Sequence, residues 1–142
     1  MIAARTGTRR ISELGGLAAR MPWAGGLLAL GALAAMGLPG LAVFVSEFMS
    51  IMGGYATFPV QGVLASFGII LSAMYLLYML ARVIFGPIES PAYEQIDDAG
   101  PAEMASLVPL ALLLVVLGVF PALLISIQRP AVDAILAVIG GS

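Results

Sequence analysis

The hydrophobic pattern divides the chain into a polar start, a long apolar region and a mixed end. Residues 1–22 are polar and basic, residues 23–127 are mostly apolar, and residues 128–142 are mixed. An acidic, proline-containing loop at residues 86–103 interrupts the apolar region. Because a membrane-spanning helix needs about 20 apolar residues, the apolar runs predict helices that cross a membrane. We therefore expect an all-α integral membrane protein with an N-terminal arm and a C-terminal tail.

The first apolar run, residues 23–55, is too long for one straight membrane-spanning helix. At 1.5 Å per residue such a helix would measure about 50 Å, whereas the hydrocarbon core of a bilayer measures about 30 Å. The sequence GLPG at residues 37–40 offers a break, because proline lacks a backbone donor and disfavours a helical conformation in the residue before it. We therefore predict two short helices, at about 23–37 and 41–53, with the second ended by the glycines at 53–54.

Two further apolar runs, at about 59–85 and 106–127, each match the length of one span. This makes about four transmembrane helices, which place the arm and the tail on one side of the membrane and the acidic loop on the other. The arginines of the arm place that shared side in the cytoplasm by the positive-inside rule. Small residues four apart, such as Gly62 and Ser66, predict close approach between helices.

The composition narrows the classes of function. Hydrophobic residues make up 61% of the sequence and charged residues 10%, and the mean hydropathy is +1.09. Ordinary soluble domains carry about a quarter charged residues, so most soluble classes are excluded. The chain has no cysteine, histidine or lysine, which excludes disulfides, the usual zinc sites and haem ligation by histidine. Without a nucleotide-binding motif or a basic tract, we expect no cofactor, metal or nucleic acid on this chain.

Glu47 is the one acidic residue inside an apolar segment, about 9 Å along its predicted helix from the break. An ionised acid at membrane depth costs several kcal/mol, and such residues commonly face a bundle interior and mark ion or proton pathways. Where desolvation is balanced by a nearby cation, a carboxyl group can exchange a proton near neutral pH. We therefore hypothesise that Glu47 is a proton relay. The alternative is a protonated or hydrogen-bonded glutamate that only fixes helix packing.

Other polar residues in the apolar segments have simpler interpretations. Arg82, near the end of its predicted helix, is interpreted as an anchor at the membrane interface. Tyr75 and Tyr78 precede it by seven and four residues and are interpreted as interface anchors or bundle contacts. Three serines are expected to donate hydrogen bonds between helices: Ser46, Ser66 and Ser72.

Several motifs, in a specific order and spacing, carry a resemblance to a known family. Residues 5–49, RTGTRRISELGGLAARMPWAGGLLALGALAAMGLPGLAVFVSEFM, contain an RTGTR loop, an ELGGLAARMP lead into a helix, and GLPG followed by FVSEF. This stretch, together with ARVIFGP at residues 81–87, resembles the C-terminal part of chain M of proton-translocating NADH-quinone oxidoreductase, respiratory complex I. The same core recurs in sister subunits and in Mrp-type cation/proton antiporters. In those relatives the position of Glu47 more often carries a lysine, or a lysine beside an acid, so the glutamate here favours the resemblance to chain M.

The resemblance implies a role in proton translocation coupled to quinone reduction. Glu47 would belong to a line of buried ionisable groups and serve as the outer or terminal proton site of its subunit. The chain would be part of an NADH:quinone oxidoreductase whose NADH, FMN, iron–sulfur clusters and quinone are bound by other subunits. Its partners would be other membrane-arm subunits and the lipid bilayer. Its location would be the prokaryotic plasma (inner) membrane.

Family members are several times longer, with about fourteen helices. We therefore expect the chain to represent the C-terminal segment of a larger antiporter-like bundle, with residues 1–22 as an interior loop of the full-length member. Two alternatives stay open. The chain is a fragment of an Mrp-type antiporter subunit, or it is a structural helical module without transport activity.

Overall fold

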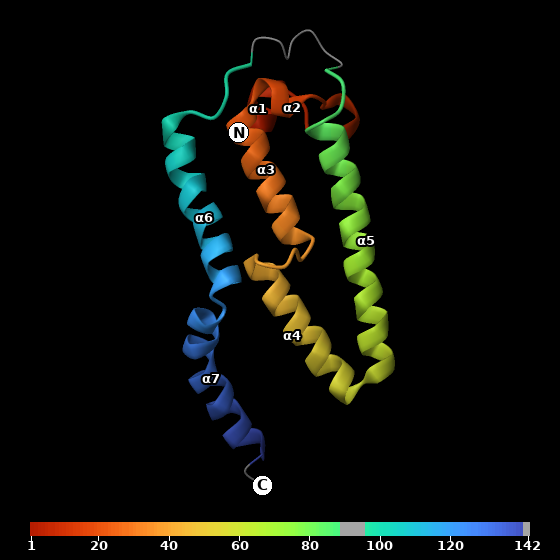
Figure 1. The fold of residues 1–142 in the computed structure, drawn as a ribbon, viewed down its shortest axis with the longest axis vertical. Helices are drawn as coiled ribbons and strands as arrows, with labels where there is room; N and C mark the ends of the chain where they lie inside the picture. The colour runs from red at the N-terminus through yellow and green to blue at the C-terminus, as the bar shows by residue number, and fades with distance from the viewer. Residues whose placement is uncertain (89–95, 141–142) are drawn as a thin grey trace.

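The computed structural model describes residues 1–88 and 96–140, and every regular element within these ranges is a helix (Figure 1). Three of the helices are long and apolar enough to cross a membrane, and a fourth is apolar but shorter. The predicted all-α membrane class is therefore confirmed. The elements are α1 (Ile2–Thr6), η1 (Ile11–Glu13), α2 (Leu17–Arg20), α3 (Pro22–Ala35), α4 (Ala42–Thr57), α5 (Pro59–Val83), α6 (Pro101–Val119) and α7 (Ala122–Gly140).

The long helices run between two ends of the molecule (Figure 1). The short helices α1, η1 and α2 gather at what we call the loop end. Helices α3 and α4 lead one after the other from the loop end to the opposite end, which we call the turn end and define by Phe58 between α4 and α5. Helix α5 returns to the loop end, and α6 and α7 then descend in one direction. Proline opens α3, α5 and α6, where its missing N–H and fixed φ are compatible with the first helical turn.

The predicted break between α3 and α4 is confirmed. Helix α3 ends at Ala35, and Gly37 has a left-handed φ of 70° that lets the N–H of Leu38 bond back to the carbonyl of Leu33. Gly40 has a φ of 92°, and α4 starts at Ala42. Two glycines therefore supply the positive φ values of this turn, and the proline between them prevents the helix from continuing.

Other predicted boundaries were wrong. Helix α4 continues through the glycines at 53–54 to Thr57 and ends only before the Phe58-Pro59 pair, where proline disfavours helix in the preceding residue. The predicted helix at 106–127 is divided, because α6 ends at Val119 and α7 begins after Pro121. The predicted tail is helical as far as Gly140. Residues 89–95 of the predicted acidic loop and residues 141–142 of the tail lie outside the described residues.

The described residues of the acidic loop, 86–88 and 96–103, lie at the same end as the arm, not at the opposite end as predicted. Arg5 Nη2 forms an ion pair with Glu103 Oε2 at 2.7 Å. The carboxylate of Asp98 accepts hydrogen bonds from the N–H groups of Trp23, at 2.8 Å, and Ala24, at 3.1 Å. The prediction failed because it counted α3 and α4 as separate crossings, whereas together they lead once from the loop end to the turn end (Figure 1).

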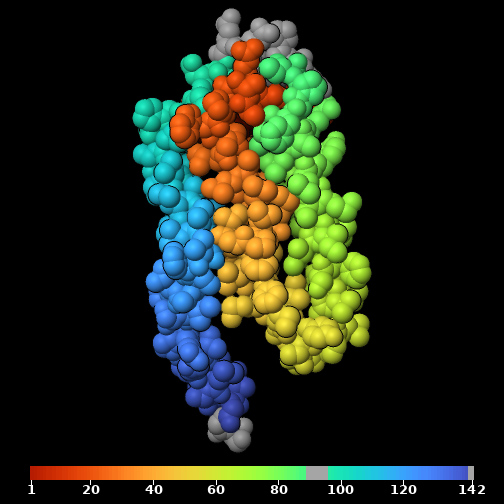
Figure 2. Space-filling view, viewed as in Figure 1, coloured from red at the N-terminus to blue at the C-terminus, as the bar shows by residue number. Residues whose placement is uncertain are grey.

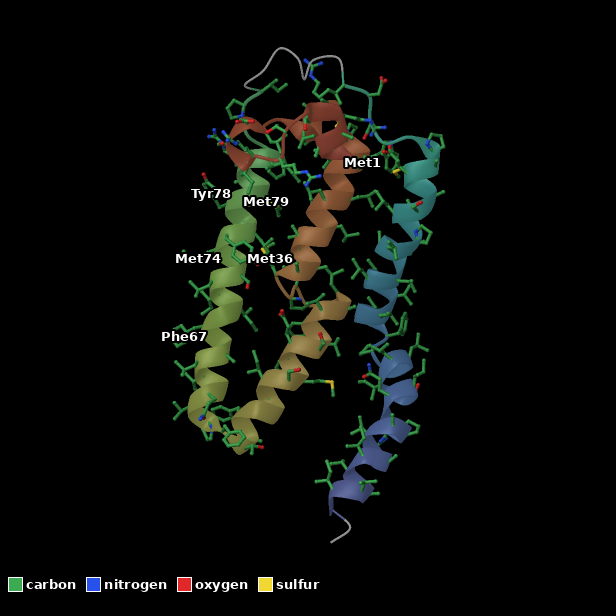
Figure 3. All side chains as sticks on the ribbon, turned by 180° about the vertical axis from the view of Figure 1, so that it is seen from behind. Met1, Met36, Phe67, Met74, Tyr78 and Met79 are labelled. Carbon is green, nitrogen blue, oxygen red and sulfur yellow. The ribbon has the colours of Figure 1, made fainter. Side chains whose placement is uncertain are left out.

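Buried side chains concentrate toward the loop end, where the arm, α3 and α5 pack closely (Figure 2). One cluster contains Leu14, Leu17, Met21, Ala24 and Val83. A second, which we call the apolar cluster, consists of Ala32, Met36, Leu80 and Ile84 and joins α3 to α5. Figure 3 shows Met36 and Met79 between these two helices.

Close approach of α4 and α5 occurs at Gly62, near the turn end. A Cβ added to Gly62 would lie 2.7 Å from Cα of Tyr55, so a side chain there would force the two backbones apart. The helices diverge toward the break and leave space between them, which positions the candidate site.

Asp98 caps α3 from a distant part of the sequence. Its carboxylate binds the N–H groups of the second and third residues of the helix, which have no partner within the helix. Burial raises the pKa of Asp98, but hydrogen bonds from Trp23, Ala99 and Ala24 and the positive charge of Arg5 outweigh this effect, and the pKa lies below its usual 3.8. The stabilisation is therefore complete above about pH 3.8 and is lost as the pH falls through the lowered pKa.

We expect Asp98→Ala to lower the free energy of unfolding by about 1 kcal/mol at neutral pH, the usual effect of removing a helix cap. The difference from the wild type should shrink as the pH falls from about 3.8 through the lowered pKa of the folded state, below which the carboxylate is protonated in both states. Thermal unfolding in detergent at two pH values measures both effects. Asp97→Ala is the matched control, because this neighbouring aspartate is exposed. An equal loss in both variants would contradict the capping role.

Candidate functional site

Glu47 lies in the second turn of α4, just past the break, and is partly buried. A Cβ added to Gly37 would collide with Oε2 of Glu47, so the carboxylate packs directly against the backbone of the break. Gly37 is favoured by its left-handed φ of 70°, and a side chain there would in addition displace the flexible end of Glu47. The structure places the predicted site residue in contact with the irregular backbone beside it.

Within the described part of the chain, the Glu47 carboxylate takes part in neither an ion pair nor a hydrogen bond. A charged carboxylate at membrane depth costs several kcal/mol unless it is solvated, paired or protonated. At such a depth the Glu47 carboxylate would require a proton, water or a group from outside these residues. A site with this requirement is chemically suited to proton exchange.

Two cavities between α4 and α5 meet at Glu47. The first, of about 380 Å³, is an open groove that we call the hydroxyl groove. Its lining residues are Ser46, Glu47, Ser50, Ile51, Ala65, Gly68, Ile69 and Ser72. The second cavity, of about 270 Å³, is more apolar and reaches from Glu47 to Gly37 and Phe44. The carboxylate is therefore accessible from the space between the two helices.

The serines near the site behave differently from the sequence prediction. Ser46 Oγ donates to the carbonyl of Val43 at 2.8 Å, and Ser66 Oγ donates to the carbonyl of Gly62 at 3.0 Å, so both bonds stay within their own helices. Short hydroxyl side chains commonly bond back to a carbonyl one turn earlier. Ser72 lines the hydroxyl groove.

Sequence reasoning missed Ser50, which also lines the groove. Its position four residues after Ser46 and three after Glu47 puts all three on adjoining parts of one helix face. That spacing is the signal that could have identified it.

Arg82, Tyr75 and Tyr78 do not line either cavity at Glu47. Arg82 Nη2 donates to the carbonyl of Ser12 at 3.1 Å, which joins α5 to the arm at the loop end. Both tyrosines are exposed on α5, and Figure 3 shows Tyr78 pointing away from the other helices. Their role as interface anchors stays a prediction.

The described residues contain no cluster of three or more histidine, cysteine, aspartate or glutamate side chains that could hold a metal ion. The expectation that this chain carries no metal, redox centre or other cofactor stays a prediction.

A family model described as NADH:quinone oxidoreductase/Mrp antiporter, TM, matches residues 1–81. The chain is 36% identical over 139 residues to NADH-quinone oxidoreductase subunit M of Mycobacterium tuberculosis H37Rv, covering 98% of this chain and 25% of the relative. It is 33% identical over 132 residues to the subunit M of Escherichia coli K12, covering 92% of this chain and 26% of the relative.

A solved structure shares the fold. One chain of respiratory complex I from Thermus thermophilus with bound NADH superposes with a TM-score of 0.77 and 33% sequence identity, covering 84% of this chain and 25% of that chain. The present chain thus spans about a quarter of the length of the relatives that it matches.

Proposed function

Because the chain belongs to the NADH:quinone oxidoreductase/Mrp antiporter transmembrane family, we propose that it is a membrane-arm segment of a redox-driven proton pump. In this proposal Glu47 is a proton-relay carboxylate, and the pump couples proton translocation to quinone reduction. The observation that carries the proposal is the position of Glu47: a carboxylate inside an apolar segment, packed on the backbone of a helix break and adjoining two cavities.

The relay works by alternation between two states of one carboxyl group. The protonated state is neutral and is stable at membrane depth, whereas the ionised state needs water or a cation to offset its desolvation. Movement of water or of a positive charge toward Glu47 would therefore favour release of its proton. Movement away from Glu47 would favour uptake of a proton. The break supports this chemistry, because irregular backbone at membrane depth survives only where protein or water satisfies its polar groups.

Electron transfer belongs to other subunits in this proposal. NADH, FMN, iron–sulfur clusters and quinone would bind elsewhere in the complex, since this sequence offers no nucleotide motif and no cysteine. The partners would be the other membrane-arm subunits and the lipid bilayer, and the location would be the prokaryotic plasma membrane. The names of the relatives, all subunits M of NADH-quinone oxidoreductases, support this assignment over a free-standing transporter.

The alternative within the same family is an Mrp-type cation/proton antiporter, which the family description also includes. The test uses the complete complex that contains this chain, reconstituted in sealed vesicles. We expect NADH and quinone to drive proton movement that stops when electron transfer is inhibited, and a sodium gradient alone to drive none. Vesicles with the complex from a strain that lacks this chain are the control. Proton movement driven by sodium and unaffected by electron transfer would establish the antiporter instead.

A further inference from the structure

The start of α6 is tied to the arm and to α3 at the loop end. Oε2 of Glu103, in the first turn of α6, accepts hydrogen bonds from Arg5 Nη2 at 2.7 Å and from the N–H of Gly100 at 2.9 Å. Five residues earlier in the sequence, Asp98 caps the first turn of α3. The short segment that leads into α6 therefore joins the starts of both helices to the arm.

The other end of α6 packs on the break between α3 and α4. Gly118, in the last turn of α6, lies so close to the carbonyl oxygen of Gly40 and the backbone of Leu41 that an added Cβ would collide with both. Between its two ends α6 is one continuous helix, and it contacts both α3 and α4 (Figure 1). Helices α3 and α6 are thus joined twice, by polar contacts at the loop end and by backbone contact at the break.

The contact at Gly118 determines where α4 begins. Leu41 is the N-cap residue of α4, is 7% exposed, and accepts a hydrogen bond from the N–H of Phe44 at 3.1 Å. Glu47 follows six residues later, about 9 Å along the same helix, so a shift of the helix start moves Glu47 as well. The break has little stiffness of its own, because Gly37 and Gly40 have positive φ values that glycine adopts without strain. Its position therefore depends on what packs against it.

We propose that α6 is a brace that holds the break in place, and that Gly118 is thereby a positioning residue for proton exchange at Glu47. Glu103 anchors the first turn of the brace, and the last turn packs on the backbone where α4 begins. A misplacement of about 1 Å at a reacting group can cost up to about a hundredfold in rate, so the brace affects translocation measurably. The positioning role rests on the proposed function of Glu47, whereas the brace itself does not.

Gly118→Ala tests the contact at the break, and Gly31→Ala is the control, because no atom lies within 4 Å of a Cβ added there. Both variants are made in the complete complex. Amide hydrogen exchange of residues 38–46 is followed by mass spectrometry, and proton translocation per assembled complex is measured in sealed vesicles. We expect Gly118→Ala to speed exchange at the break at least about fivefold and to slow translocation at least about twofold. Gly31→Ala should change neither quantity.

Glu103→Ala tests the anchor at the loop end without adding bulk at the break. Its control is Glu13→Ala, which removes an ion pair inside the arm and leaves the contacts of α6 intact. If α6 transmits the constraint, only Glu103→Ala should speed exchange at residues 38–46, by at least about twofold, with exchange in α5 unchanged. Faster exchange confined to residues 96–105 would show that α6 transmits nothing to the break and would overturn the brace.

The two measurements separate the brace from the proposed function. Unchanged exchange at the break in Gly118→Ala would overturn the brace, and if that variant does not assemble, Glu103→Ala decides the question alone. Faster exchange with unchanged translocation, while Glu47→Gln is impaired, would overturn the positioning role of Gly118. Faster exchange in both variants, with normal translocation in Glu47→Gln, would retain the brace and reject the relay.

Discussion

Glu47→Gln, placed in the complete subunit, should lower redox-driven proton translocation by roughly tenfold or more, because glutamine cannot take up or release a proton. The amide closely matches the carboxyl group in size, so the packing against Gly37 and the assembly of the complex should be retained. Proton uptake per NADH oxidised in sealed vesicles measures the first quantity. Native gel electrophoresis of the solubilised complex measures the second.

Glu47→Asp is the matched control for this prediction. It keeps an ionisable carboxyl group but shortens the side chain by one methylene, so we expect a milder loss of translocation than in the glutamine variant. If the glutamine variant assembles poorly, and the complex that does assemble pumps normally, then Glu47 is a packing residue. The structural-module alternative would then stand.

Replacing Gly118 by alanine should destabilise the fold more than the added methyl group of a glycine-to-alanine change does at most positions. A Cβ there would collide with the carbonyl oxygen of Gly40 and with the backbone of Leu41. These atoms belong to the break itself and cannot rotate away as a side chain can. We expect Gly118→Ala to lower the free energy of unfolding by up to about 3 kcal/mol, at the upper end of the usual cost of overpacking.

The same change at Gly31 is the control for Gly118→Ala. Gly31 lies inside α3, and no atom lies within 4 Å of an added Cβ. Alanine there should be neutral or should stabilise α3 by up to about 1 kcal/mol, because alanine favours a helix more than glycine does. Thermal unfolding of both variants in detergent measures the difference. Equal effects would show that α6 does not pack tightly on the break.

Local signals in the sequence correctly predicted the break between α3 and α4 and the start of α5. The break was predictable because proline and the glycines around it act on their own backbone, and Pro59 likewise defined the start of α5. Pro121 is the same kind of signal, yet the division between α6 and α7 was missed. The run at 106–127 matches the length of one span, and the length argument was given priority over the proline.

The position of the acidic loop depends on tertiary structure, so the sequence could not decide it. Whether α3 and α4 cross the membrane separately or in succession determines on which side every later segment lies. The helix pattern alone is compatible with both arrangements. The contacts of Asp98 and Glu103 with the arm and α3 join residues 74 to 98 positions apart in the sequence, beyond the reach of any periodicity.

The candidate site was predicted in its central residue but not in its surroundings. A lone acid in an apolar run identified Glu47, and the family motifs predicted the resemblance to subunit M, which the comparisons confirm. The hydroxyl groove depends on how α4 and α5 diverge above Gly62, which a single sequence does not specify. The relay role of Glu47 stays a prediction.

Because Glu47 contacts Gly37, the residues that are tolerated at these two positions, which lie ten apart in the sequence, are linked. A shorter acid at position 47 would free the space beside position 37, but the left-handed backbone would still disfavour a side chain at position 37. The carboxylate can therefore change while the glycine remains, whereas a side chain at position 37 is strained by the left-handed backbone whatever residue occupies position 47.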